Sequence, residues 1–331
     1  YAPGLLAICI LPAMDIWESK NNRSMYRDQV QKDPGRWNME KIVAQDRIRF
    51  EFPPVSSLSM EGFSCVDMHC HTNHSAAPVG VSDALRIAER KNIGIAVTDH
   101  NQVSGSLEAI AKATSTLVIP GIEVSALDGP HILVYFYSAG DLRDFYKTFI
   151  EKRKQDSPYL AIRASTSDII DWASGYPCIC SAAHPYGYLL FNKGIGRCVE
   201  RNYLPEDLIP RFDAIEVISG GMPRSENIRA VQLAEKYNLG YTGGTDAHLL
   251  HDYGRVLTCA LSDTVDEFLD AVISQQNFVF GREKSLAGKS LMGALIAPRY
   301  VPYLFPSLAI HYEQNIPRIL RFLRHMRDHQ K

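Results

Sequence analysis

The sequence predicts an α/β protein with parallel, barrel-like strands, and two observations lead to this prediction. Short apolar runs alternate with helical patterns at the spacing of strand–helix units, which build parallel sheets. Candidate metal-ligating side chains also recur beside the carboxyl ends of these runs, where α/β barrels place their chemistry. Histidines and acids scattered over a surface would not keep returning to strand ends.

The alternation begins near residue 63 and continues to about residue 281. We expect strands over residues 63–69, 95–98, 117–119, 132–137, 178–182, 214–218, 241–245, 256–261 and 278–280. We expect helices over residues 82–91, 104–114, 141–154, 166–174, 225–237 and 264–275. Ser82 is expected to cap the first helix, and Gly240 to close the helix over residues 225–237, because these residue types suit those ends.

The chain on either side lacks this alternation. Residues 1–60 carry no clear chemistry and are predicted to form an N-terminal arm. Its apolar run over residues 5–14 is too short for a bilayer span, and no basic residues precede it as in a signal peptide. Residues 61–284 form the predicted barrel, and residues 285–331 a helical C-terminal extension.

A basic stripe marks the end of this extension. Its members follow helical spacing beside apolar residues, and they are Arg318, Arg321, Arg324 and Arg327. The stripe fits a docked helix with one solvated face, or a contact with nucleic acid or a membrane surface.

Composition narrows the class of protein further. The 331 residues are 46% hydrophobic and carry a formal net charge of −2, so a large core is available and no overall charge attracts nucleic acid. Seven scattered cysteines, an odd number, indicate buried thiols in a reducing, cytoplasmic location. The sequence predicts no integral membrane segment and leaves the oligomeric state open.

The motif with the most direct chemistry is His69-Cys70-His71, at the end of the first predicted strand. Residues two apart in an extended segment point to the same side, so both imidazoles can aim at one point. Two converging neutral imidazoles are a platform for a metal ion. Taken alone, the motif could equally be a pair of histidines in a polar turn.

Further candidate ligands lie beside the later strands. They are His100, Glu123, His184, Asp246 and His248, with His131 at the start of a strand instead. No G-x-S-x-G elbow and no Walker-type loop occur, so the sequence indicates neither a serine hydrolase nor a P-loop NTPase.

In this order the segments resemble the PHP family, the polymerase and histidinol phosphatase domain. The matching stretches are Asp67-Met68-His69-Cys70-His71-Thr72, Thr98-Asp99-His100, Pro120-Gly121-Ile122-Glu123, His131, Ala183-His184-Pro185 and Gly243-Gly244-Thr245-Asp246-Ala247-His248. They look most similar to the stand-alone phosphoesterases of that family. The resemblance implies a distorted (β/α)7 barrel that holds two to three divalent metal ions.

The resemblance also implies which residues hold each ion. One ion would be held by His69, His71, Glu123 and Asp246, a second by Glu123, His131 and His184, and a third by His100 and His248. Zn, Mn and Fe all suit such mixed ligands, and the sequence does not choose between them.

Ala76 departs from the family pattern, because it stands where an aspartate ligand of the third ion is expected. Three explanations are open. The third ion is weak or absent, or His74 or another nearby group replaces the aspartate, or the alanine is an introduced substitution.

The implied activity is metal-dependent hydrolysis of a phosphate ester, on a nucleotide or the end of an oligonucleotide. A metal-bound hydroxide would attack phosphorus, and His100, His248 or a metal-bound water would handle protons. Asp99 and Asp67 are expected to orient ligand imidazoles, or else to cap strand ends.

Basic and aromatic residues near strand ends are candidate substrate ligands. The candidates for phosphate are Lys193, Arg197, Arg224 and Arg255, and those for stacking a base are Tyr186, Tyr188 and Tyr253. The segment with Lys193 and Arg197 can also be a solvated insertion.

Two other functions stay open. One is a metal-dependent amidohydrolase that cleaves C–N bonds, although no candidate carboxylated lysine lies at a strand end. The other is a degenerate metal-binding module with a structural or interaction role, which Ala76 alone favours.

Overall fold

The computed structural model describes residues 47–187 and 194–328. The apolar run over residues 5–14, Tyr188 and Lys193 lie outside the described residues.

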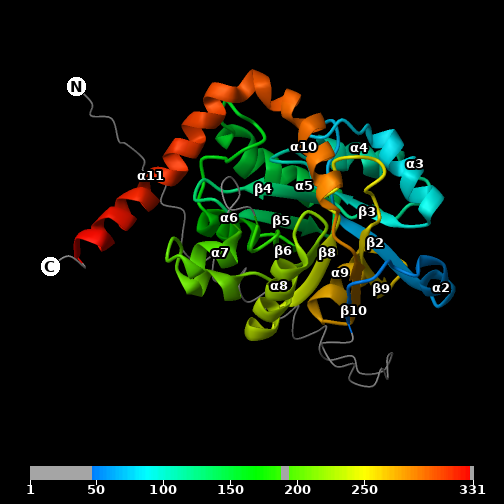
Figure 1. Cartoon of the computed structure of the whole chain (residues 1–331). Helices are drawn as coiled ribbons and strands as arrows, with labels where there is room; N and C mark the ends of the chain where they lie inside the picture. The colour runs from blue at the N-terminus through cyan, green and yellow to red at the C-terminus, as the bar shows by residue number, and fades with distance from the viewer. Residues whose placement is uncertain (1–46, 188–193, 329–331) are drawn as a thin grey trace, which may run out of the picture. The chain divides into compact units, whose positions relative to one another are not determined.

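The described chain is a mixed α/β fold with two five-stranded sheets (Figure 1). The first sheet has the order β1-β10-β9-β2-β3, with strands Ile48–Arg49, Asn277–Gly281, Val256–Leu261, Phe63–Cys70 and Gly94–Val97. The second has the order β4-β5-β6-β7-β8, with strands Gly121–Ser125, His131–Phe136, Cys178–Ala182, Ala214–Ser219 and Gly240–Gly244. Part of the predicted N-terminal arm thus joins the first sheet as β1.

The prediction of parallel strands holds for only part of each sheet. The pairs β2–β3, β6–β7 and β7–β8 are parallel, whereas β2–β9–β10 and β4–β5–β6 are antiparallel. The connection between β4 and β5 is too short for a crossover helix, so those two strands can only pair antiparallel.

The sheets meet at two seams without closing into a hydrogen-bonded barrel among the described residues. Isolated bridges join Ile95 to Val118 and His100 to Glu123 at one seam, and Cys70 to Ala247 at the other. The (β/α)7 barrel is therefore not confirmed. The strand predicted over residues 117–119 makes only the Val118 bridge, and β4, which was not predicted, begins after it.

The helices follow the predicted order with shifted ends. They are α2 Val55–Met60, α3 Val81–Lys91, α4 Ser104–Lys112, α5 Ala139–Phe145, α6 Thr166–Ala173, α7 Ile195–Glu200, α8 Arg224–Tyr237, α9 Val265–Ile273, α10 Leu286–Tyr300 and α11 Leu304–Asp328. Gly80, not Ser82, precedes α3, and left-handed Asn238, not Gly240, ends α8. The helix predicted over residues 141–154 divides into α5, a π turn and a 3-10 turn.

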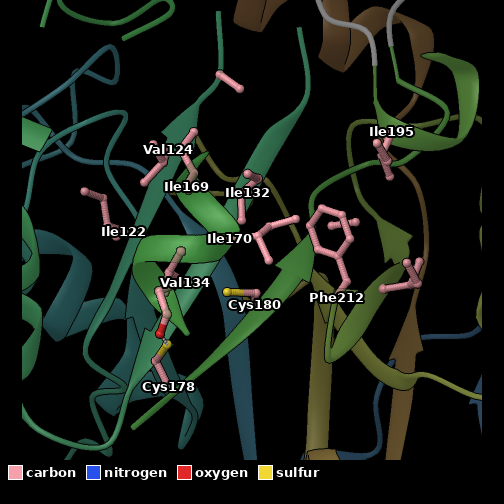
Figure 2. Close-up of a cluster of buried hydrophobic side chains, with 14 of the residues drawn as sticks. Ile122, Val124, Ile132, Val134, Ile169, Ile170, Cys178, Cys180, Ile195 and Phe212 are labelled. Carbon is pink, nitrogen blue, oxygen red and sulfur yellow. Dashed lines mark hydrogen bonds between the residues drawn. The ribbon is translucent and has the colours of Figure 1, made fainter. Parts of the chain in front are cut away.

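Apolar packing fixes the second sheet against α6 (Figure 2). Ile122 and Val124 of β4 are fully buried with Ile169 and Ile170 of α6. Because alternate strand residues face opposite sides, burying Ile122 and Val124 on one face turns Glu123 to the other. The core thereby positions the carboxylate that the candidate site is built around.

The cysteines differ from the expectation of seven buried thiols. Cys65 of β2 lies opposite Cys259 of β9 in the antiparallel register, and the two form a disulfide. Cys70, Cys178, Cys180 and Cys198 are buried thiols, as expected. The cytoplasmic location stays a prediction.

The C-terminal extension is helical, as predicted, through α10 and α11. The side chains of the basic stripe, Arg318, Arg321, Arg324 and Arg327, lie outside the described residues. Within the described ranges, no helix has the length and apolar character needed to cross a bilayer.

Glycine at position 244 lets β8 approach β2. A Cβ atom there would lie 2.6 Å from the backbone nitrogen of His69 and closer still to the His69 Cβ atom. No side chain fits between these two strands, so the seam needs glycine.

We predict that Gly244→Ala lowers the free energy of unfolding by about 1–3 kcal/mol, the usual cost of overpacking. Gly293→Ala is the control, because a Cβ at this position of α10 meets nothing within 4 Å. It should leave stability unchanged or raise it by about 0.5–1 kcal/mol. Urea titration followed by circular dichroism measures both, and equal stabilities of the two variants would contradict the close approach.

Candidate metal centre

The structure brings all eight predicted ligands into one cluster. They are His69 in β2, His71 directly after it, His100 after β3, Glu123 in β4, His131 at the start of β5, His184 after β6, and Asp246 and His248 after β8. Seven of the eight residues are buried, and His131 is nearly so. Their assignment to individual ions stays a prediction.

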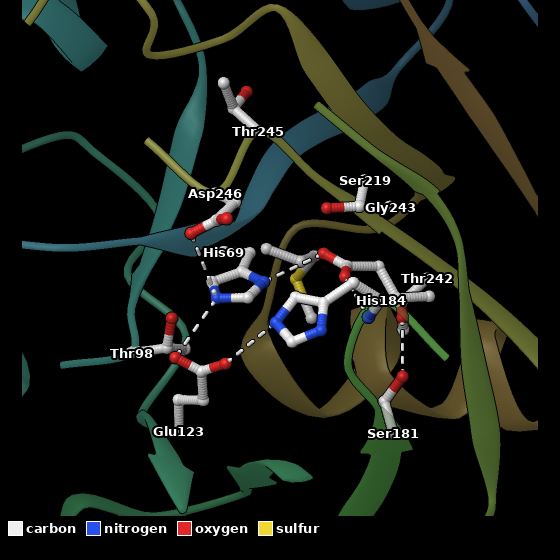
Figure 3. Close-up of polar contacts among 12 residues, drawn as sticks. His69, Thr98, Glu123, Ser181, His184, Ser219, Thr242, Gly243, Thr245 and Asp246 are labelled. Atoms are coloured by element: carbon white, nitrogen blue, oxygen red, sulfur yellow. Dashed lines mark hydrogen bonds and ion pairs between the residues drawn. The ribbon is translucent and has the colours of Figure 1, made fainter. Parts of the chain in front are cut away.

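Four donor atoms of this cluster have the spacing of a tetrahedral metal site, and Figure 3 shows those of His69, Glu123 and Asp246. His69 Nε2 and His71 Nε2 are 3.1 Å apart. Each lies 3.4–3.5 Å from Glu123 Oε2 and 3.2–3.7 Å from Asp246 Oδ1. Ligand atoms about 2.1 Å from a tetrahedral zinc ion are about 3.4 Å from one another. These donors therefore fit a divalent ion.

Glu123 lies at the middle of the cluster. Its Oε1 atom is 2.8 Å from His131 Nδ1 and 3.3 Å from His184 Nε2, and its Oε2 atom is 2.7 Å from His100 Nδ1. Figure 3 shows the contacts of Glu123 with His69 and His184. A carboxylate with imidazoles on both oxygens can bridge two ions, as the family resemblance implies.

The third group of donors contains imidazoles alone. His71, His100 and His248 can converge on one point, and no carboxylate joins them in this group. Ala76 is fully buried and offers no ligand atom. His74 does not replace the aspartate, because both of its ring nitrogens have other partners. Its Nδ1 atom is 2.8 Å from Ser104 Oγ, and its Nε2 atom is 2.8 Å from Glu108 Oε2.

Glu216, which the sequence analysis placed in a strand without a role, orients two of the ligands. Its Oε1 atom accepts a hydrogen bond from His69 Nδ1 at 2.9 Å, and its Oε2 atom accepts one from the His184 backbone nitrogen at 2.7 Å. The bond to Nδ1 leaves His69 Nε2 as the lone-pair atom that faces the cluster. No sequence motif surrounds Glu216. The one feature that could have identified it is an acidic residue in a mostly apolar strand, β7.

Asp67 and Asp99 hydrogen-bond to the loops beside their strands, as expected of the alternative that they cap strand ends, and an orienting role for them stays a prediction. Asp99 accepts hydrogen bonds from the Thr72 backbone and hydroxyl at 2.7 and 2.6 Å, and from Ser75 Oγ at 2.5 Å. Asp67 accepts hydrogen bonds from the backbone nitrogens of Thr245 at 2.8 Å and Gly254 at 2.7 Å. Both carboxylates secure the segments that carry ligands.

Burial and neighbouring charges set the protonation states of the ligands. Burial lowers the pKa of His71 well below its usual range, and it lowers the pKa of His248 to about 4. Both rings are therefore neutral at neutral pH and have a lone pair for a metal. Burial opposes charge on Glu123, but His100 and His131 lower the pKa of this carboxyl well below its usual range.

Lys284 is a second residue that the sequence analysis did not single out. Its buried Nζ atom donates a hydrogen bond to the Asp246 backbone oxygen at 2.7 Å and lies 3.3 Å from Asp252 Oδ2. Asp246 has a φ of 51°, which is uncommon for a residue other than glycine. The ammonium group thus stabilises the turn that presents a ligand.

The predicted phosphate-binding arginines have acidic or aromatic neighbours. Arg197 lies 3.1 Å from Glu226, and Arg224 forms a two-pronged pair with Glu283 at 2.5 and 2.9 Å. The Arg255 guanidinium lies 5.8 Å from the ring centroid of Phe52. The segment after His184 also differs from a solvated insertion, because α7 occupies its second half.

The predicted base-stacking tyrosines are engaged as well. The Tyr253 hydroxyl donates a hydrogen bond to the His71 backbone oxygen at 2.8 Å, and its ring is fully buried. The Arg229 guanidinium lies 4.0 Å from the Tyr186 ring centroid. Tyr253 therefore positions a ligand segment, and its predicted stacking role is wrong.

Residues 224–277, from α8 to the first residue of β10, match a family model described as PHP-associated. Over this segment the chain is similar to the PHP family. This similarity agrees with the order and convergence of the eight ligands described above. A comparison with curated protein sequences gives no match.

Solved structures with the same fold include endonuclease Q. Its complex with a 27-mer duplex, in which an abasic lesion lies at the active site, has a TM-score of 0.52 at 14% identity over 67% of this chain and 60% of that chain. The lesion-specific endonuclease Q of Pyrococcus furiosus has a TM-score of 0.50 at 13% identity over 66% and 57%. A two-domain protein of Bacteroides vulgatus with a predicted PHP-like metal-dependent phosphoesterase gives 0.49 at 16% identity over 71% and 68%.

We predict that Glu216→Gln weakens metal binding about 10- to 100-fold, the usual effect of losing a carboxylate that orients a ligand histidine. Titration calorimetry with Zn²⁺ and with Mn²⁺ measures the dissociation constants. Glu206→Gln is the control, because Glu206 is exposed and pairs with Lys236. An unchanged dissociation constant for Glu216→Gln, in a folded variant, would contradict the orienting role.

Proposed function

We propose that this chain belongs to the PHP family and is a metal-dependent phosphoesterase that acts on a nucleotide or the end of an oligonucleotide. The observation that supports it best is the convergence of His69, His71, Glu123 and Asp246 at tetrahedral spacing beside further imidazoles. Phosphate esters are the substrates that such clusters of divalent sites suit.

The chemistry divides between the ions and the side chains. Divalent ions bound here would neutralise phosphoryl oxygens and acidify a bound water. His248 Nδ1 lies 3.1 Å from the Asp246 backbone oxygen and donates its proton there, so Nε2 is the atom that can accept a proton. Because burial keeps His248 neutral, it can act as a base at neutral pH.

We also interpret the fold as an opened form of the (β/α)7 barrel. The strands β2 to β8 follow one another around a ring, and isolated bridges join β3 to the chain before β4 and the end of β2 to the chain after β8. The candidate ligands lie at one end of this ring.

The amidohydrolase alternative gains no support from the structure. Lys284 is a buried lysine beside the cluster, but its Nζ atom is held as an ammonium group by Asp252 and the Asp246 backbone oxygen. A carboxylated lysine would carry a negative charge and would be repelled by the Asp252 carboxylate.

We predict metal-dependent release of phosphate by the purified protein. Phosphomonoesters, nucleoside bisphosphates, short oligonucleotides and simple amides are assayed with Zn²⁺, Mn²⁺ or Fe²⁺ and with excess chelator. Esters should be cleaved, amides should not, and chelator or Glu123→Gln should reduce the rate at least about 100-fold, because removing one electrostatic element of a site typically costs that much. Activity that survives chelator would contradict the proposal.

We predict that the chain with alanine at position 76 binds two ions and that Ala76→Asp binds three. An added carboxylate would give the imidazoles of His71, His100 and His248 the anionic partner that their group lacks. Elemental analysis of protein purified after metal loading gives the count. Ala76→Ser is the control, because it adds volume without charge. Three ions in the chain with alanine at position 76 would show that this alanine does not weaken the third site.

A further inference from the structure

Helix α10 is tied at both ends to the segments that carry metal ligands. Just before it, Lys284 bonds to the backbone oxygen of Asp246. Near its end, Arg299 Nη1 lies 3.5 Å from the backbone oxygen of Ser75, in the loop that follows His71. Figure 1 shows α10 running beside the loop after β8. The C-terminal extension therefore covers part of the candidate metal centre.

The end of α10 adds aromatic rings to the part of the extension that covers the candidate metal centre. The Tyr159 ring contacts Tyr300 edge to face at 5.9 Å and Tyr303 at 5.5 Å, measured between ring centroids. Tyr300 is close enough to the ligands that Glu123 and Asp246 add to the effect of burial in raising the pKa of its phenol. Burial raises the pKa of the Tyr159 phenol, and the positive charge of Arg299 opposes this rise.

Arg299 also brings a positive charge to the loop beside the third donor group, His71, His100 and His248, which contains no charged ligand. Ser75, whose oxygen it contacts, precedes Ala76, the position without the expected carboxylate. A guanidinium group binds two oxygens of one phosphate, and a flat tyrosine face stacks on a nucleobase. Divalent sites, a guanidinium and tyrosine rings together suit a phosphate joined to a nucleoside.

We propose that Arg299, Tyr300 and Tyr159 form a substrate-binding roof over the metal centre, in which Arg299 binds the phosphate and the tyrosines hold the base of a nucleotide. This inference rests on the proposed function, because it assigns substrate contacts for the same site. It differs from the earlier prediction in placing the phosphate contact on the C-terminal extension, whereas that prediction placed it on Lys193, Arg197, Arg224 and Arg255.

Binding to the metal-loaded protein tests the roof without requiring turnover. Inorganic phosphate, a nucleoside monophosphate and glycerol phosphate are titrated by calorimetry. Arg299→Ala should weaken all three about 10- to 100-fold, since a charge-assisted hydrogen bond contributes about 1.5–3 kcal/mol. Tyr159→Leu should weaken the nucleotide about 5- to 100-fold, the range for loss of one stacked base, and leave phosphate and glycerol phosphate unchanged.

Controls separate the roof from folding and from the proposed activity. Arg86→Ala removes an exposed arginine that pairs with Asp83 on α3 and should change none of the affinities. Metal content and thermal midpoint of each variant confirm that the site is intact. Chelator-sensitive hydrolysis with natural affinities in Arg299→Ala and Tyr159→Leu would overturn the roof alone. Absent hydrolysis with these affinity losses would overturn the proposed activity alone.

Discussion

The buried carboxylate of Glu123 is the constraint on which the rest of the site depends. A charge removed from water is costly unless it is paired, and the imidazoles of His100, His131 and His184 supply the partners here. These partners come from three different segments, so the carboxylate links both sheets at the seam where His100 bridges to it. When divalent ions are bound, the same carboxylate oxygens and the lone pairs of these imidazoles would become ligands of the ions.

The scaffold around Glu123 follows from simple packing. Ile122 and Val124 enter the core of the second sheet, which leaves Glu123 no direction but toward the other ligands. On the opposite side, glycine at position 244 lets β8 come close enough for Asp246 to reach the same point as His69. Neither the apolar packing beside Glu123 nor the glycine at position 244 contacts a metal ion, yet each determines where a donor atom lies.

The ligands could be predicted because strand ends and short motifs are local features of the sequence. His69-x-His71 needed only the alternation of an extended segment. Glu216 could not be found in this way, because its partners come from β2 and from the end of β6 and no local spacing marks it. The partners of Asp99 could not be found for the same reason, because its bonds go to Thr72 and Ser75, well before it in the chain. Barrel closure and antiparallel pairing also depend on contacts that no local pattern contains.

The balance of charge explains why the C-terminal extension belongs to the site. Ala76 removes a negative charge from the third donor group, and a cation bound by neutral imidazoles alone is held less strongly than one with a carboxylate. Arg299 brings a positive charge to the loop that carries Ala76, and in the proposed roof it is the group that attracts a substrate phosphate. Lys284 is buried and paired with Asp252, so it holds the turn at Asp246 instead. The protein itself would thus neutralise the negative charge of the substrate at this end of the cluster, while the ligands around Glu123 would bind the metal ions.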